Sequence, residues 1–133
     1  MRKWMMGALL AASMTGAAFA QDTEIQGVIG NQIEAFKSDN FEEAFSFASP
    51  GIRGIFGTPE NFGRMVTQGY PMVWRPAEVT YLGLDDENGV LSQTVRIVDA
   101  DGATHLLKYR MLETDDGWKI NGVQLIEAPG VSA

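Results

Sequence analysis

Residues 90–126 read VLSQTVRIVDADGATHLLKYRMLETDDGWKINGVQLI, and this stretch decides the fold class. Apolar and polar residues alternate in three segments rich in β-branched and aromatic side chains, which is typical of half-buried strands. The separators DADG and TDDG are turn sequences that close β-hairpins. Upstream, residues 79–84 (VTYLGL) and the separator DDENG repeat the pattern. Successive short turns predict an antiparallel sheet of four to five strands in chain order.

The segment before these strands has a helical period. Its apolar residues recur every three or four positions from about Asp22 to Lys37, and such a stripe must face a core. Thr23 and Gln26 have the spacing of a capping box, which predicts that the helix starts here. The stripe consists of Ile25, Val28, Ile29, Ile33 and Phe36.

Two shorter helices are predicted next. Asp39, with a glutamate three residues on, is expected to cap the first, which cannot continue past Pro50. Residues 49–57 (SPGIRGIFG) are expected to form a loop. Thr58 is expected to cap the second, and Gly69 to close it in the left-handed conformation. The predicted fold class is therefore α+β, with three N-terminal helices packed on a curved antiparallel sheet.

Residues 69–76 (GYPMVWRP) connect the helices to the sheet. Pro71 is expected to block any continuation of the helix. Pro76 places the following residues at a strand start or sheet edge, because proline cannot donate to a ladder. Arg75 then has two interpretations. It is either a clamp that satisfies carbonyls of the 49–57 loop, or a charged contact at the rim of a binding site.

Residues 1–20 have the organisation of a secretory signal peptide. Two basic residues precede an apolar run that ends in Ala18, Phe19 and Ala20, a small-x-small cleavage site. The alternative, an uncleaved anchor, is disfavoured because the run is shorter than the roughly 20 residues of a membrane-spanning helix. We expect an exported protein, periplasmic or secreted, that is soluble after cleavage near Ala20, with no stable membrane insertion. Residues 21–133 are expected to form a single domain.

Composition disfavours several functional classes. The chain has 17 acidic and 10 basic residues and a net charge of −7, which opposes binding to nucleic acid or anionic lipid. Cysteine is absent, so disulfides and lipid attachment at a lipobox are excluded, and a single histidine argues against a catalytic zinc site. The DADG and DDENG turns resemble calcium loops. However, position 12 counted from Asp99 is Arg110 and not the required glutamate. No metal and no cofactor are expected.

Acid–base groups suited to catalysis are few. Most aspartates belong to predicted helix starts or turns, so an inward carboxylate base would have to be Glu78 or Glu113, near strand ends. His105 is the only histidine, and its spacing from Tyr109 places both side chains on the same face of the predicted strand. It could act as a general base. A partly exposed residue beside the DADG turn is the simpler interpretation, because no nucleophile or orienting partner is evident.

An aromatic and polar set near the sheet is the remaining candidate for a site. Aromatic side chains with a few placed polar groups are what a small-ligand pocket needs, although they also fill the core of any concave sheet. The alternation of side chains along each strand places Tyr109 on the inner face of the sheet and Arg96 on the outer face. The candidate ligand-binding residues, in a pocket or at its rim, are Trp74, Arg75, Tyr81, His105, Tyr109 and Trp118.

The order of elements, with Trp118 and Lys119 following the last turn, resembles the nuclear transport factor 2-like superfamily, or cystatin-like cone. A closer resemblance covers nearly all of residues 21–133. The run from 44 to 76, with KINGV at 119–123, is similar to the domain of unknown function 4864 family. That resemblance implies a cone fold and export, and it brings no established reaction, cofactor or catalytic residue. The wider superfamily includes isomerases, dehydratases and hydrolases as well as proteins that only bind partners, so the fold leaves function open.

Two classes of function follow as hypotheses. The first is a non-enzymatic domain of the cell envelope that binds a small apolar ligand or a protein partner. The alternative is a small cone-fold enzyme, a hydrolase, dehydratase or isomerase, in which Tyr109 works with His105 or Glu113. Self-association as a homodimer is a third alternative.

Overall fold

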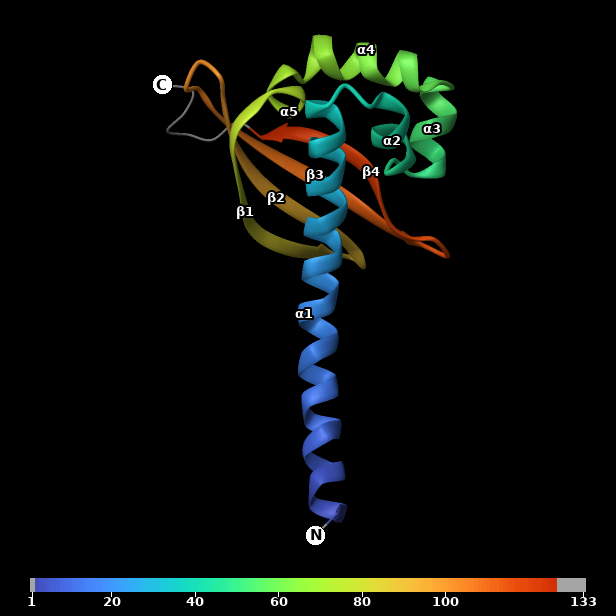
Figure 1. Cartoon of the computed structure of the whole chain (residues 1–133), viewed down its shortest axis with the longest axis vertical. Helices are drawn as coiled ribbons and strands as arrows, with labels where there is room; N and C mark the ends of the chain where they lie inside the picture. Colours follow the sequence, from blue (N-terminus) through green and yellow to red (C-terminus); the bar gives the residue numbers. More distant parts are fainter. Residues whose placement is uncertain (1, 127–133) are drawn as a thin grey trace.

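A computed structural model describes the backbone of residues 2–126 and the side chains of residues 20–126 (Figure 1). The predicted signal peptide, apart from Ala20, lies outside the residues whose side chains are described. The helices of the described residues are α1 (Arg2–Lys37), α2 (Phe41–Ser46), α3 (Pro50–Phe56), α4 (Pro59–Gly69) and α5 (Pro71–Trp74). The strands are β1 (Pro76–Glu87), β2 (Val90–Asp99), β3 (Thr104–Thr114) and β4 (Gly117–Ile126).

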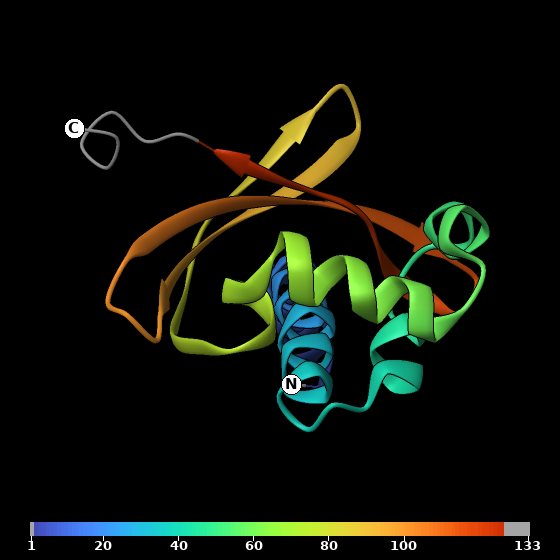
Figure 2. The same cartoon turned by 90° about the horizontal axis from the view of Figure 1, so that it is seen from above.

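The strands form one antiparallel sheet in the order β1-β2-β3-β4, which confirms the predicted meander. The predicted range of four to five strands resolves to four in the described residues. All the helices lie on one side of the sheet, and the sheet is not strongly curled (Figure 2). It has less curvature than the predicted cone. Tyr109 lies in the middle of the sheet, opposite Gln93 on β2 and Val123 on β4.

Helix α1 buries the predicted apolar stripe against the inner face of the sheet. Its end at Lys37 confirms the prediction, but the predicted start is wrong, because α1 continues through Thr23 and Gln26 instead of beginning there. Within the described residues, no helix has both the length and the hydropathy to span a membrane. The buried core shared by α1 and the sheet contains Ile25, Ile29, Ile33, Phe36, Val95, Ile97, Leu107 and Tyr109.

The cap of α2 lies one residue later than predicted. Asn40, and not Asp39, accepts the backbone N–H of Glu43 through its side-chain oxygen (3.1 Å). Asp39 has φ 57°, in the left-handed region that aspartate tolerates better than most residues. It therefore ends the turn that leaves α1, and Asn40 starts the next helix.

Residues 49–57 are not the predicted loop but contain helix α3. The Ser49 hydroxyl accepts the backbone N–H of Ile52 (3.3 Å), and Pro50 takes the first helical position, where its missing N–H costs nothing. The backbone N–H of Ser49 also donates to the Ile120 carbonyl on β4 (2.9 Å). Helix α3 is thus fixed at its start to the edge of the sheet.

The link from α4 to the sheet is more compact than predicted. Thr58 caps α4 by accepting the Asn61 N–H (3.1 Å), which confirms that prediction. Gly69 is the last residue of α4 and has no left-handed conformation, so its predicted role is wrong. Helix α4 ends before Pro71, as predicted, but Pro71 then opens the short helix α5 instead of an extended segment. Pro76 begins the edge strand β1, as predicted.

Arg75 ties the end of α1 to the start of β1. Its guanidinium donates to the Phe36 carbonyl (2.9 Å) and to both carboxylate oxygens of Asp39 (3.0 and 3.2 Å). It also lies 4.2 Å from the ring centroid of Trp74, whose Nε1 donates to Asp39 Oδ1 (2.9 Å). The hydrogen bond from Trp74 and then that from Arg75 hold the pKa of Asp39 below its ordinary value. Arg75 is a clamp, but on the end of α1 and not on residues 49–57.

We expect Arg75→Ala and Arg75→Lys both to lower the denaturant midpoint. The loss in the lysine variant should be more than about half of the loss in the alanine variant. A single ammonium cannot reach the Phe36 carbonyl and both Asp39 oxygens while stacking on Trp74. Circular dichroism during urea unfolding at pH 7 measures this. Arg96→Lys is the matched control on the exposed outer face and should leave the midpoint unchanged. A lysine variant as stable as the wild type would show that the several hydrogen bonds of the guanidinium add nothing to the stability that a single ammonium provides.

Candidate functional site

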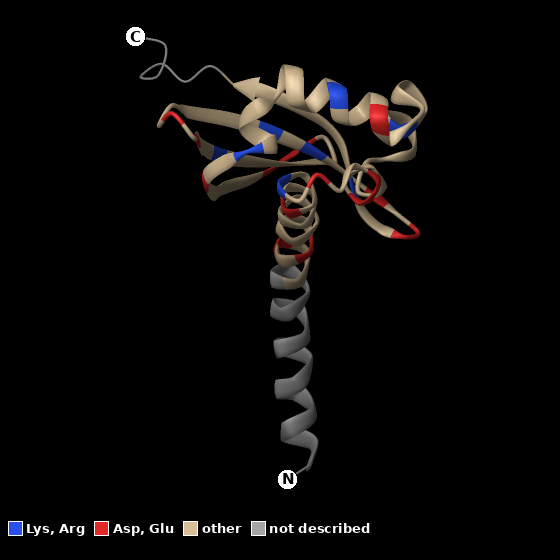
Figure 3. Cartoon of the chain, turned by 45° about the horizontal axis from the view of Figure 1, so that its top comes forward, with Lys and Arg blue, Asp and Glu red and all other residues tan. Residues whose placement is uncertain are grey.

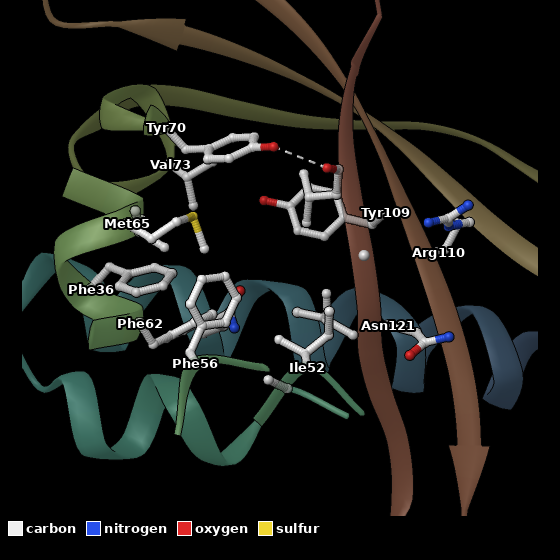
Figure 4. A pocket seen from close by; sticks show the side chains of 16 residues that line it. Phe36, Ile52, Phe56, Phe62, Met65, Tyr70, Val73, Tyr109, Arg110 and Asn121 are labelled. Atoms are coloured by element: carbon white, nitrogen blue, oxygen red, sulfur yellow. Dashed lines mark hydrogen bonds between the residues drawn. The ribbon is translucent and has the colours of Figure 1, made fainter. Parts of the chain in front are cut away.

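A cavity of about 400 Å³ lies between the helices and the end of the sheet formed by β3 and β4. It is partly open to solvent, and its volume falls in the range of roughly 300–1,000 Å³ that is usual for small-ligand pockets. Figure 4 shows the cavity from close by. Its lining residues are Gln32, Phe36, Ala48, Ile52, Phe56, Phe62, Met65, Val66, Tyr70, Val73, Tyr109, Arg110, Ile120, Asn121, Gly122 and Val123.

A cluster of phenylalanine rings forms the wall on the helical side. Phe62 on α4 is at its centre, with ring centroids 5.9 Å from Phe36, 5.4 Å from Phe45 and 5.7 Å from Phe56. Tilted and edge-on contacts at these separations are favourable for aromatic pairs. Because the rings come from four different helices, their packing keeps α1, α2, α3 and α4 at fixed distances from one another and holds this wall in place.

Tyr109 on β3 forms the floor of the cavity on the sheet side. The residue is completely buried, and its hydroxyl has no hydrogen-bond partner within the described part of the chain. Figure 4 shows this hydroxyl directed across the cavity toward Met65. Burial raises the pKa of the phenol well above its ordinary value, so at neutral pH the group is a protonated donor.

Three other polar side chains of the lining make hydrogen bonds within the protein. The Tyr70 hydroxyl donates to the Val123 carbonyl (3.2 Å), and the Gln32 amide donates to the Ala44 carbonyl (3.1 Å). Asn121 Oδ1 accepts a hydrogen bond from the Ser49 hydroxyl (2.7 Å). Tyr109 is the completely buried side chain of the described lining whose donor has no partner.

No charged group of the described lining projects into the interior. Arg110 lies on the far side of its strand in Figure 4 and packs over Gly122, where a Cβ would be 3.0 Å from its Nη2. None of the lining residues is acidic. Figure 3 shows Asp and Glu at turns of the sheet and on the helices. Asp22, predicted at a helix start, lies inside α1. The interior is apolar apart from its hydroxyl and amide groups.

Comparison with known proteins gives one match. The model of the family described as Domain of unknown function (DUF4864) matches residues 18–133. The chain belongs to the DUF4864 family. Neither a curated protein nor a solved structure matches it.

Of the residues predicted for the site, this DUF4864 domain places Tyr109 in the cavity lining and the others outside it. Trp74 and Arg75 form the clamp on α1. Tyr81 is half-buried against α1, where a Cβ on Gly30 would lie 3.0 Å from its hydroxyl, and burial raises its pKa.

The last two predicted residues also have structural positions. Trp118 is 9% exposed and belongs to the core of the domain. His105 Nε2 and Asp99 Oδ2 are 2.8 Å apart across the β2–β3 turn. That hydrogen bond is the main reason that the pKa of Asp99 lies below its ordinary value.

His105 and Glu113 do not line the cavity of the DUF4864 domain. Each is four residues from Tyr109 along β3, which is about 13 Å at the rise of a strand. The distance of about 3 Å that acid–base catalysis beside the Tyr109 hydroxyl requires is not available to either residue from these positions.

Sequence reasoning missed most of the lining. The sequence predicts a loop for Ile52 and Phe56, although they lie on α3 and line one side of the cavity. The signal was present, because Ser49 followed by Pro50 repeats the pattern of Thr58 followed by Pro59 that correctly predicted α4. Tyr70 and Met65 depend on how α4 and α5 pack, which no local pattern encodes.

The two tyrosines of the cavity should respond differently to loss of their hydroxyls. We expect Tyr109→Phe to leave the free energy of unfolding unchanged or to raise it by up to about 1 kcal/mol, because an unpaired buried hydroxyl costs free energy. Tyr70→Phe should lower it by about 0.5–1.5 kcal/mol, because the bond to Val123 is lost. Urea unfolding of both variants measures the difference. An equal loss in both would mean that the Tyr109 hydroxyl is hydrogen-bonded within the protein.

Proposed function

We propose that this protein is an exported, non-enzymatic domain that binds a small apolar ligand in the cavity between its helices and its sheet. The observation that carries the proposal is the fully buried Tyr109 hydroxyl, which faces an apolar cavity of about 400 Å³ without a protein partner. Buried polar groups are nearly always hydrogen-bonded, so an exception that faces a cavity points to a bound molecule.

The lining favours an apolar ligand. Ten of its side chains are Phe, Ile, Val, Met or Ala, and removing an apolar molecule from water against such a surface is favourable by roughly 25 cal/mol per Å². The Phe62 cluster adds stiffness, because its rings belong to several elements and cannot collapse into the space one at a time. A wall held open in advance loses little conformational entropy when the ligand binds.

The enzyme alternative has less support. Tyr109 could stabilise an oxyanion, yet the described lining offers it no carboxylate and no imidazole as a base. His105 is engaged with Asp99 at the end of the strand. Binding therefore accounts for the geometry with fewer requirements than catalysis does.

We also propose a cellular location and a superfamily for this protein. Residues 1–20 have the features of a cleaved signal peptide, which supports export to the periplasm or the medium. Helices on one side of a four-stranded meander, with a ligand space between the layers, support a place in the nuclear transport factor 2-like superfamily as a member with a shallow sheet.

Binding of 2-ethylnaphthalene, a fluorescent apolar probe, tests the proposal. Its fluorescence anisotropy should rise in a saturable way on titration with the protein. Ile52→Trp, which adds a large ring to the half-buried cavity wall, should weaken binding by at least about tenfold, since most of the apolar contact is then blocked. Leu112→Trp places the same ring at a position that is 41% exposed outside the cavity, and should bind as the wild type does.

Circular dichroism and thermal unfolding must first show that both tryptophan variants are folded. Absence of saturable binding to the wild type would contradict the proposal. So would equal binding to Ile52→Trp, because the probe would then occupy some other surface.

A further inference from the structure

We infer that the ligand of this cavity is a neutral molecule that carries a hydrogen-bond acceptor, such as a ketone, ester or aldehyde oxygen, and that the Tyr109 hydroxyl recognises that oxygen. The inference rests on the proposed function and adds the chemical class of the ligand. It follows from which polar groups of the cavity are free and which are already engaged.

The free group is a donor. The side chain of Tyr109 is 0% exposed, and its hydroxyl is without a partner in the described part of the chain. The phenol remains protonated at neutral pH because burial opposes the phenolate. A phenol is a stronger donor than acceptor, so its unmet requirement is for an oxygen or nitrogen lone pair on the ligand. A purely hydrocarbon ligand would leave this requirement unmet.

The position of the hydroxyl also favours this assignment. Tyr109 is anchored between Gln93 and Val123 in the sheet, and its buried hydroxyl points toward the cavity (Figure 4). Gln93 is not its partner, because Gln93 Oε1 and the Tyr109 hydroxyl both lack a hydrogen bond within the described residues. The Gln93 amide nitrogen donates instead to the carbonyls of Leu82, Gly83 and Thr94 (3.0–3.2 Å). A ligand oxygen would meet the Tyr109 donor while the apolar part of the molecule lies against the Phe62 cluster.

An anionic ligand does not fit the same space. A carboxylate in an apolar cavity needs a cation, and the nearest arginine of the lining packs over Gly122 on the other side of the sheet. The net charge of −7 also opposes the approach of an anion. A neutral carbonyl gains the hydrogen bond from Tyr109 without burying a charge.

Three naphthalenes of nearly equal shape test the inference: 2-ethylnaphthalene, 2-acetylnaphthalene and 2-naphthoate. Fluorescence titration gives the Kd of each with wild type, Tyr109→Phe and Tyr70→Phe. Tyr109→Phe should weaken 2-acetylnaphthalene about 3- to 10-fold, the worth of one neutral hydrogen bond, and leave 2-ethylnaphthalene unchanged. Tyr70→Phe is the matched control, because its hydroxyl already donates to Val123, and it should not change the ratio of the two affinities. The naphthoate should bind the wild type at least about tenfold more weakly than the ketone.

A second measurement needs no variant. The carbonyl stretching frequency of 2-acetylnaphthalene bound to the wild type should fall below its value in hexane, as it does when a hydroxyl donates to the oxygen. If 2-ethylnaphthalene does not bind at all, the proposed function fails. If it binds, but Tyr109→Phe leaves the affinity for the ketone unchanged, the carbonyl frequency is unshifted, or the naphthoate binds best, this inference alone is overturned.

Discussion

Burial of one face of α1 against the sheet is the constraint on which the rest of the structure depends. The isoleucines at positions 25, 29 and 33 are at most 3% exposed, and they pack on a sheet face built from Val95, Ile97, Leu107 and their neighbours. With no cysteine in the chain, noncovalent contacts must stabilise the domain without disulfides. The Arg75 clamp completes this arrangement, because it fixes the end of α1 to the chain just before β1.

The cavity is a consequence of where this helix ends. Helix α1 stops at Lys37, so the space over β3 and β4 is covered by the shorter helices α2, α3 and α4. Ser49 fastens α3 to the edge of the sheet at Ile120, while the Phe62 cluster joins the helices to one another. These two fixed points hold the helical layer away from Tyr109. Buried atoms of Arg53, Ser92 and Gln93 also lack a partner within the described residues, but these side chains do not line the cavity. The unpaired hydroxyl of Tyr109 does, and it gives the cavity a chemical preference.

The sequence predicted those parts of the fold that depend on local pattern. Alternation and turn residues gave the four strands and their order, and the period of the isoleucines gave α1 up to its end. Parity alone placed Tyr109 inside and Arg96 outside. The helix over residues 50–56 was also predictable, since Ser49 and Pro50 are a helix start signal. The three glycines of SPGIRGIFG instead favoured the prediction of a loop.

Other features depend on contacts between distant residues. The partners of Arg75 are Phe36 and Asp39, far away in the sequence, and the left-handed conformation of Asp39 is what allows Asn40 to cap α2. The cavity is likewise a result of packing, because its lining comes from four helices, two strands and the residues between them. Only Tyr109 of the predicted site residues lies in it. The other predicted site residues have structural roles: they pack in the core or against α1, form the Arg75 clamp, or lie beside a turn.

A crystal structure of the protein with 2-acetylnaphthalene bound tests the central claim most directly. The account predicts the naphthalene rings against the Phe62 cluster and the ketone oxygen within about 2.5–3.0 Å of the Tyr109 hydroxyl, the distance of an O–H to oxygen hydrogen bond. A probe bound outside the cavity, or a Tyr109 hydroxyl that donates to a protein atom while the ketone points elsewhere, would contradict it.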